Sequence, residues 1–149
     1  MAKQQPNLAP WLTPPPDFES DLVGDAAQQR SVLVIDDSPM VRQQLRRLLV
    51  DAGFAVVEAV DGAEGKRLLE TRDDFVLVLC DVLMPRLDGV EMLEAIQAEA
   101  QGVSVPVIML TTEGQPALLK RAVRAGARGW VMKPFRAELL LRVAKRLVE

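Results

Sequence analysis

Short apolar runs alternate with amphipathic stretches five times between Ser31 and Glu149. A short, continuous apolar run suits a strand that is buried on both faces, and an apolar stripe at helical spacing suits a helix that covers such a sheet. The alternation therefore predicts an α/β domain in which one parallel sheet carries helices on both faces. The expected strands are 31–35, 54–60, 76–80, 105–110 and 129–132.

The stretches between these runs carry helix signals. Ser38 and Pro39 suit the N-cap and first position of the first helix, and Gly53 suits its end. A capping box is expected over 61–64, where an aspartate precedes a glutamate by three residues. Later helices are expected to follow Asp88-Gly89 and to run from Pro116 to Ala125. The apolar stripe of the last helix is expected to hold Ala137, Leu140, Leu141, Ala144 and Leu147.

Residues 1–30 differ from the rest of the chain. Five of the ten prolines lie before Asp17, and neither a helical nor a strand period appears. We predict a proline-rich, flexible tail over 1–30 and a folded domain over 31–149. Alternatively, Trp11, Leu12 and Phe18 could dock on a partner or fold back on the domain.

The composition excludes several kinds of chemistry. The chain has no histidine, so it can form neither a phosphohistidine, nor a Ser–His–Asp set, nor a histidine metal site. Its one cysteine, Cys80, forms no intramolecular disulfide and is expected to point into the core as a small apolar side chain. With no signal peptide or membrane span expected, we predict a cytoplasmic protein.

The net charge of −3 is unevenly distributed. Residues 113–149 hold nine Lys or Arg against three Glu, whereas residues 1–112 hold nine basic and eighteen acidic residues. The basic end is consistent either with a solvated surface or with a docking surface for an acidic partner.

Polar residues follow four of the expected strands. Asp36 and Asp37 come after the first, Asp81 after the third and Lys133 after the fifth, while Thr111 closes the fourth. The carboxyl ends of strands in a doubly wound sheet meet in one crevice, so these side chains are expected to converge. Lys133 offsets only one of the three carboxylates, and an all-oxygen site of this kind favours Mg²⁺, with Mn²⁺ as a substitute.

This set of residues suits phosphoryl transfer. If Asp81 attacks a phosphoryl group, the metal, Lys133 and the Thr111 hydroxyl can each contact one phosphoryl oxygen. The product would be an aspartyl phosphate, which is open to hydrolysis. Such a site suits a transient covalent mark better than a turnover enzyme.

Four motifs together resemble the receiver domain of two-component response regulators. They are Val-Ile-Asp-Asp-Ser at 34–38, Asp-Val-Leu-Met-Pro-Arg-Leu-Asp-Gly at 81–89, Leu-Thr-Thr-Glu at 110–113 and Gly-Trp-Val-Met-Lys-Pro-Phe at 129–135. The resemblance covers 31–149 and is to the single-domain type, typified by the chemotaxis response regulator. It implies a flavodoxin-like, doubly wound sheet of five parallel strands in the order 2-1-3-4-5, with five helices.

The resemblance also implies roles for the metal-site residues. Asp81 would be the phosphoacceptor and a metal ligand. Asp37 would bind Mg²⁺ directly, and Asp36 directly or through water. The backbone carbonyl of Leu83 would complete the protein ligands.

Further roles concern signalling. Thr111 and Lys133 would contact the phosphoryl group, and the Lys133–Pro134 bond would be cis. Movement of Thr111 would let an aromatic residue on the fifth strand swing inward. Here that residue is Trp130, where the family more often has Tyr or Phe.

Two positions would tune the lifetime of the phosphoryl group: Leu83 and Glu113. Because an apolar Leu83 cannot orient an attacking water, we expect a comparatively persistent phosphoryl group. A haloacid dehalogenase-like phosphatase would need a carboxylate at position 83, so we set that function aside.

The resemblance implies a stand-alone response regulator that is phosphorylated by a histidine kinase or a histidine phosphotransfer protein. Its output would be a switched face formed by 116–125, 129–132 and the last helix, which would bind an effector protein, and the basic charge of this end is consistent with an acidic effector. Nucleic-acid binding is not expected. A phosphorelay carrier or phosphate sink remains the alternative, while the intact Asp, Thr and Lys set argues against a constitutive scaffold.

Overall fold

The computed structural model describes residues 31–84, 86–99, 104–112 and 116–148. Within them, five parallel strands form one sheet in the order β2-β1-β3-β4-β5. The predicted flavodoxin-like fold and strand order are therefore confirmed. The strands are β1 (Ser31–Ile35), β2 (Ala55–Ala59), β3 (Phe75–Asp81), β4 (Val107–Thr111) and β5 (Gly129–Met132).

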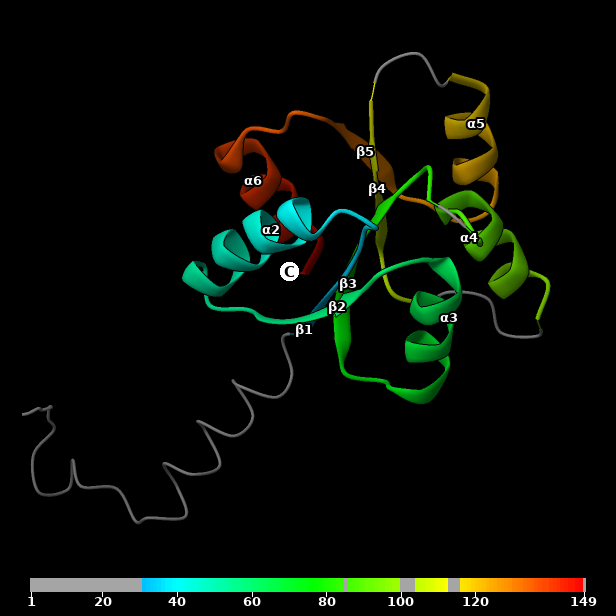
Figure 1. The fold of residues 1–149 in the computed structure, drawn as a ribbon, viewed down its shortest axis with the longest axis horizontal. Helices are drawn as coiled ribbons and strands as arrows, with labels where there is room; N and C mark the ends of the chain where they lie inside the picture. Colours follow the sequence, from blue (N-terminus) through cyan, green and yellow to red (C-terminus); the bar gives the residue numbers. More distant parts are fainter. Residues whose placement is uncertain (1–30, 85, 100–103, 113–115, 149) are drawn as a thin grey trace, which may run out of the picture.

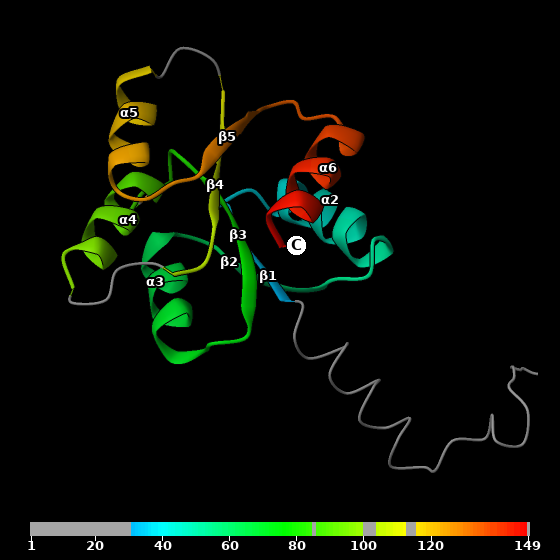
Figure 2. The ribbon, with the colours of Figure 1, turned by 180° about the vertical axis from the view of Figure 1, so that it is seen from behind.

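Five helices cover the sheet in two layers. Helices α2 and α6 lie on one face, and α3, α4 and α5 lie on the other (Figures 1 and 2). This arrangement follows from the strand order, because a right-handed crossover places its helix on a face that depends on its direction across the sheet, and the crossover from β1 to β2 runs opposite to those from β2 through β3 and β4 to β5. The helices are α2 (Pro39–Asp51), α3 (Gly62–Thr71), α4 (Gly89–Gln97), α5 (Pro116–Arg124) and α6 (Ala137–Val148).

Strand alternation divides the core into two apolar layers. In β3, Val78 and Cys80 face the α3–α4–α5 layer, whereas Leu77 and Leu79 face the α2–α6 layer. All four side chains are fully buried. Cys80 thus packs as the small apolar side chain that its place in the strand predicts.

The helix caps agree with the sequence in part. The Ser38 hydroxyl accepts a hydrogen bond from the Val41 amide at 3.3 Å, as expected for an N-cap. Asp61 caps α3, but the Glu64 carboxylate accepts from the amide of Val60 rather than of Asp61, so the predicted capping box is incomplete. The reciprocal pair occurs instead at the start of α4, between Asp88 and Glu91.

Several expected boundaries are wrong by one or two residues. Strand β3 extends to Asp81, which lies in the strand rather than after it. Strand β4 begins at Val107 rather than at residue 105, because Pro106 has no amide hydrogen to donate to the ladder. Ala137 is exposed in the first turn of α6, so it is not part of the buried stripe, whose buried members are Leu140 and Ala144.

The expectations for the tail over 1–30 lie outside the described residues. Among the described helices, none is long and apolar enough to cross a membrane.

The start of α4 lies very close to the backbone at the end of β3. The amide of Gly89 donates to the Val82 carbonyl at 3.0 Å. A Cβ atom at position 89 would lie 2.3 Å from the Asp81 carbonyl oxygen, a backbone atom that cannot move away independently. Only glycine fits at this position without displacing the end of β3.

We therefore expect Gly89→Ala to lower the free energy of unfolding by about 2 kcal/mol, because the added methyl group forces α4 away from β3. Gly129→Ala is the matched control, since its Cβ would come no closer than 3.7 Å to Ile108. Urea denaturation followed by circular dichroism measures both. Equal stability of the two variants would contradict the close approach at Gly89.

Candidate functional site

Four strand ends bring the predicted site residues together at the carboxyl edge of the sheet. Asp36 directly follows β1, Asp81 ends β3, Thr111 ends β4 and Lys133 directly follows β5. Carboxylate oxygens of Asp36, Asp37 and Asp81 lie within 4.8 Å of one another. The three acidic residues thus form one cluster rather than three separate surface charges.

One lysine bridges two of these carboxylates. The Lys133 ammonium lies 2.9 Å from Asp36 Oδ2 and 3.3 Å from Asp81 Oδ1. Asp36 is fully buried, and its other oxygen accepts a hydrogen bond from the Ser38 amide at 2.9 Å. Both oxygens of Asp36 are therefore satisfied by the protein, while Asp37 is exposed at the mouth of the cluster.

The cluster shifts the pKa values of Asp81 and Lys133. Burial, followed by the negative charge of Asp36, raises the pKa of Asp81 to about 6, although Lys133 opposes the shift. Burial works against protonation of Lys133, but the hydrogen bond to Asp36 and the charge of Asp81 prevail and raise its pKa. Lys133 therefore stays cationic, and Asp81 is ionised only above the mildly acidic range.

The donor set fits a hard divalent cation. The carboxylates are close enough to share one ion, and Lys133 balances only one of their charges. Oxygen ligands without nitrogen or sulfur favour Mg²⁺ or Mn²⁺ over softer metals. Leu83, whose carbonyl is the further expected ligand, lies in the loop after β3 with its side chain half exposed.

A clamp that the sequence did not reveal holds the loop after β3. Arg86 has a φ of 67°, in the left-handed region, and its Nε donates to Asp61 Oδ2 at 2.8 Å. Its second guanidinium nitrogen donates to the same oxygen. The Gly62 amide also donates to the Leu87 carbonyl at 2.8 Å. These bonds fix the loop that carries Leu83 to the start of α3.

No hydrogen bond connects Thr111 and Trp130, the two residues expected to act in the switch. Thr111 is buried, and its hydroxyl donates to the carbonyl of Thr112 at 2.8 Å. The Trp130 side chain is 49% exposed and lies beside α5, so the aromatic residue faces outward in this structure. Glu113, expected to tune the phosphoryl lifetime, lies outside the described residues.

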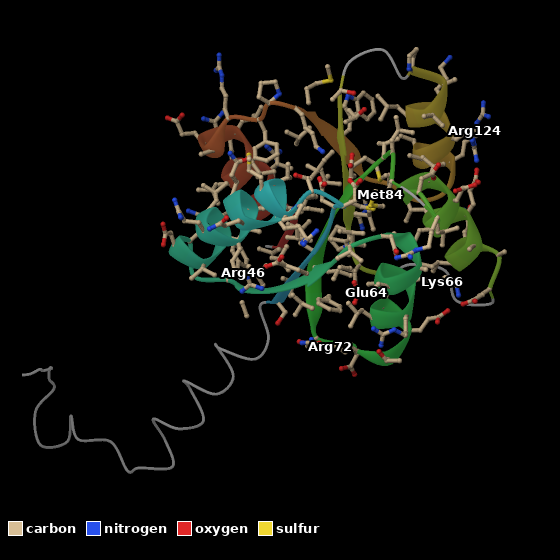
Figure 3. All side chains as sticks on the ribbon, in the orientation of Figure 1. Arg46, Glu64, Lys66, Arg72, Met84 and Arg124 are labelled. Carbon is tan, nitrogen blue, oxygen red and sulfur yellow. The ribbon has the colours of Figure 1, made fainter. Side chains whose placement is uncertain are left out.

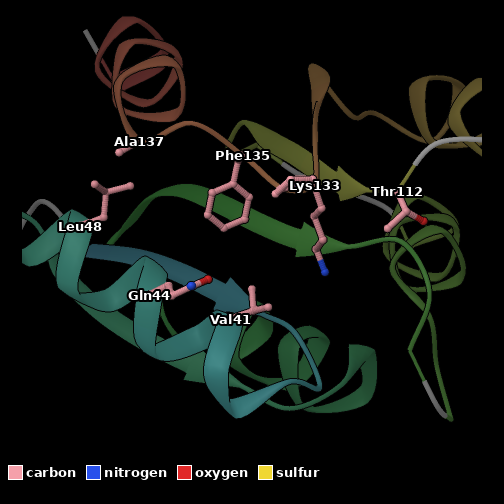
Figure 4. Close-up of a pocket in the computed structure, with 8 residues that line it drawn as sticks. Val41, Gln44, Leu48, Thr112, Lys133, Phe135 and Ala137 are labelled. Atoms are coloured by element: carbon pink, nitrogen blue, oxygen red, sulfur yellow. The ribbon is translucent and has the colours of Figure 1, made fainter.

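An open groove of about 520 Å³ adjoins Lys133 (Figure 4). It lies between α2 and the connection from β5 to α6, which includes the cis Lys133–Pro134 bond. Three α2 side chains point into it from one side and Phe135 from the other. The residues that line the groove are Val41, Gln44, Leu48, Thr112, Lys133, Pro134, Phe135 and Ala137.

The arginines of α2 are mostly engaged within the domain. Arg42 and Arg46 both pair with Glu58 of β2, and Arg42 also donates to the Asp36 carbonyl at 2.7 Å. They therefore brace α2 against β2 and the site rather than forming a free basic surface.

Comparisons with known proteins agree with this geometry. A sequence profile of the response regulator receiver domain matches residues 32–145. This chain belongs to the response regulator receiver family. The receiver is 34% identical over 110 residues to a chemotaxis protein CheY homolog of Campylobacter jejuni, an alignment that covers 73% of this chain and 85% of the relative.

Solved structures place the receiver in the same group. Chemotaxis protein CheY4 of Vibrio cholerae matches with a TM-score of 0.72 and 36% identity, covering 80% of this chain and 98% of that chain. By sequence, the receiver also matches DctD, a C4-dicarboxylate transport transcriptional regulatory protein of Pseudomonas aeruginosa, with 37% identity over 81% of this chain but only 26% of DctD. The receiver is thus a two-component signalling domain that resembles CheY.

The raised pKa of Asp81 leads to a prediction on stability. Because folding raises this pKa, ionised Asp81 destabilises the folded state above pH 6 and does so less as the pH falls toward 4. In Mg²⁺-free buffer, Asp81→Asn should raise the free energy of unfolding by about 2 kcal/mol at pH 7.5 and by little at pH 4.5.

Urea denaturation at both values of pH measures the difference. Asp73→Asn is the control, because Asp73 is exposed in the connection from α3 to β3 and the same change there should leave stability unaltered. A loss of stability in Asp81→Asn at pH 7.5 would contradict the charge assignment.

Proposed function

We propose that this receiver accepts a phosphoryl group on Asp81 in the presence of Mg²⁺ and thereby switches a surface that binds a partner protein. The observation that carries the proposal is the buried cluster in which Lys133 bridges Asp36 and Asp81 beside Asp37. Membership of the receiver family supports a phosphodonor kinase and a downstream effector in general terms.

Asp36, Asp37 and Asp81 would hold the metal, with the Leu83 carbonyl as a further ligand. When bound, Mg²⁺ supplies positive charge that offsets the excess carboxylate charge and neutralises phosphoryl oxygens. Asp37 is the exposed member of the set and is therefore suited to take up a partly hydrated ion from solvent.

The chain supplies the nucleophile and a cation. An Asp81 carboxylate oxygen attacks the phosphorus of a phosphohistidine, the bond from phosphorus to the imidazole nitrogen breaks, and the donor's imidazole leaves. With its pKa at about 6, Asp81 is ionised and nucleophilic at neutral pH. Lys133, which now spans Asp36 and Asp81, can exchange its longer 3.3 Å contact for a phosphoryl oxygen while it keeps Asp36.

The output would pass through the face formed by α5, β5 and α6. Rotation of the Thr111 hydroxyl from Thr112 toward the phosphoryl group would alter the end of β4, which pairs with β5. Trp130 and Met132 are exposed on β5, so a change there reaches the surface directly. The covalent mark is on the protein's own side chain, and we propose a signalling switch rather than a turnover enzyme.

Not every arginine on this face is free to bind an acidic partner. Arg121 forms two hydrogen bonds to the Glu94 carboxylate of α4, at 2.7 and 3.1 Å, so its charge is already balanced. Among the described residues, no carboxylate pairs with Lys120 or Arg124, which are therefore the cations of α5 that an acidic partner could use.

Phosphoryl incorporation tests the proposed function. Incubated with Mg²⁺ and acetyl phosphate, the protein should gain the mass of one phosphoryl group on the peptide that contains Asp81. Asp81→Asn and a metal chelator should each abolish the gain, whereas Asp73→Asn should not. Unchanged labelling of Asp81→Asn, measured by mass spectrometry, would place the phosphoryl group elsewhere.

Leu83 leads to a second prediction on the phosphorylated protein. Its half-exposed apolar side chain, two residues after Asp81, cannot hydrogen-bond a water molecule for attack. Leu83→Asn supplies such a group and should speed loss of the phosphoryl group by about tenfold, whereas Leu83→Met should not. An unchanged rate of dephosphorylation in Leu83→Asn would reject this role.

A further inference from the structure

An apolar groove between α5 and β5 has no part in the phosphorylation site. Its volume is about 420 Å³, and its walls are formed by Pro116, Leu119, Lys120, Val123, Arg124 and Trp130. Trp130 and Val123 are each about half exposed, at 49% and 48%. Large apolar side chains gathered in a hollow with a polar rim are typical of a protein-binding surface.

The rim of this groove is basic. Among the described residues, no carboxylate forms an ion pair with Lys120 or Arg124, whereas their neighbour Arg121 is held by Glu94. Arg124 lies at the outer side of α5, away from the sheet (Figure 3). An occupant of the groove should therefore combine apolar side chains with carboxylates.

One segment of the chain has this composition. Residues 17–25 read Asp-Phe-Glu-Ser-Asp-Leu-Val-Gly-Asp, with four carboxylates, no basic residue and three large apolar side chains. Phe18 and Leu22 are four residues apart, a spacing that places two side chains on one face of a helix. The carboxylates lie on both sides of these two residues.

We propose that residues 17–25 dock in the α5–β5 groove of their own chain, with Phe18 and Leu22 against Trp130 and the acidic residues beside Lys120 and Arg124. The segment covers the surface that an acidic effector would use. That regulatory consequence rests on the proposed output face, whereas the docking itself does not.

The chain is long enough for this contact. From Ser31, the groove at Trp130 is three strand spacings of about 4.8 Å away across the sheet and about four residues of 3.3 Å along it, a direct separation of roughly 20 Å. The eight residues between Leu22 and Ser31 allow about 30 Å when extended, and Phe18 has about 13 Å more. The surplus permits a path around the domain.

Docking within one chain also has a concentration advantage. Because only eight residues separate Leu22 from Ser31, the effective concentration of the segment at the groove is on the order of millimolar. A weak contact is then enough to occupy the groove, and an effector must displace the segment before it binds.

Fluorescence of the full-length protein tests the proposal. The chain has two tryptophans, so Trp11→Phe leaves Trp130 as the only one. In that background, without phosphodonor or Mg²⁺, Phe18→Ala/Leu22→Ala should raise the acrylamide quenching constant of Trp130 about twofold, because removal of the segment uncovers a ring with half of its surface free. Leu8→Ala/Leu12→Ala, in the same tail, is the control and should change nothing.

Charge reversal and its rescue test the orientation. Lys120→Glu/Arg124→Glu should raise quenching as the apolar variant does, and the addition of Asp21→Lys/Asp25→Lys should restore protection. Equal quenching in the parent and in Phe18→Ala/Leu22→Ala would overturn the proposal. Protection that is lost on dilution would also overturn it, because it would assign the groove to a second copy. Since no phosphoryl group is present, these outcomes are independent of whether Asp81 is phosphorylated.

Discussion

A single ammonium group, that of Lys133, connects side chains at the ends of three strands, on the carboxyl edge of the sheet. Lys133 after β5 pairs with Asp36 after β1, across 97 residues of sequence, and also reaches Asp81 at the end of β3. Asp36 is fully buried, and a buried carboxylate without a cationic partner would cost several kcal/mol. The site therefore depends on the sheet that brings β1, β3 and β5 to one edge, and the local charge at that edge depends on Lys133.

The same arrangement leaves the site with an excess of negative charge. One ammonium cannot balance three carboxylates, and burial keeps the pKa of Asp81 at about 6. A divalent cation would relieve this imbalance, and a phosphoryl group would give Lys133 a new partner. The hydrogen bonds between Arg86 and Asp61 hold the neighbouring loop to the start of α3. The residual repulsion in the cluster thus favours the ion and the phosphoryl group that we propose it binds.

Local patterns in the sequence predicted the parallel sheet with helices on both faces and the convergence of the site, whereas the strand order was implied by the resemblance to receiver domains. The convergence of Asp36, Asp81 and Thr111 could be predicted from the apolar runs that precede them and from the geometry of a parallel sheet. The pairs Arg86–Asp61 and Arg121–Glu94 join residues 25 and 27 positions apart, and no local pattern distinguishes such partners from other surface charges.

The predictions that failed were decided by tertiary context. The reciprocal carboxylate bond at the start of α3 goes to a different amide, and the capping box lies at α4, because the preceding backbone fixes which amide each glutamate reaches. For Trp130, the predicted inward swing stays a prediction, and its outward orientation in this structure depends on how α5 packs beside β5. Neither property is encoded in residue type alone.

We propose that the carboxylate cluster holds one divalent cation next to Lys133. Calorimetric titration of Mg²⁺ into the protein at pH 7.5 measures this binding. We expect one site, at least about tenfold weaker binding in Asp37→Asn and unchanged binding in Asp73→Asn. Mg²⁺ binding of the same affinity in Asp37→Asn and in the unaltered protein would show that the cluster does not hold the ion.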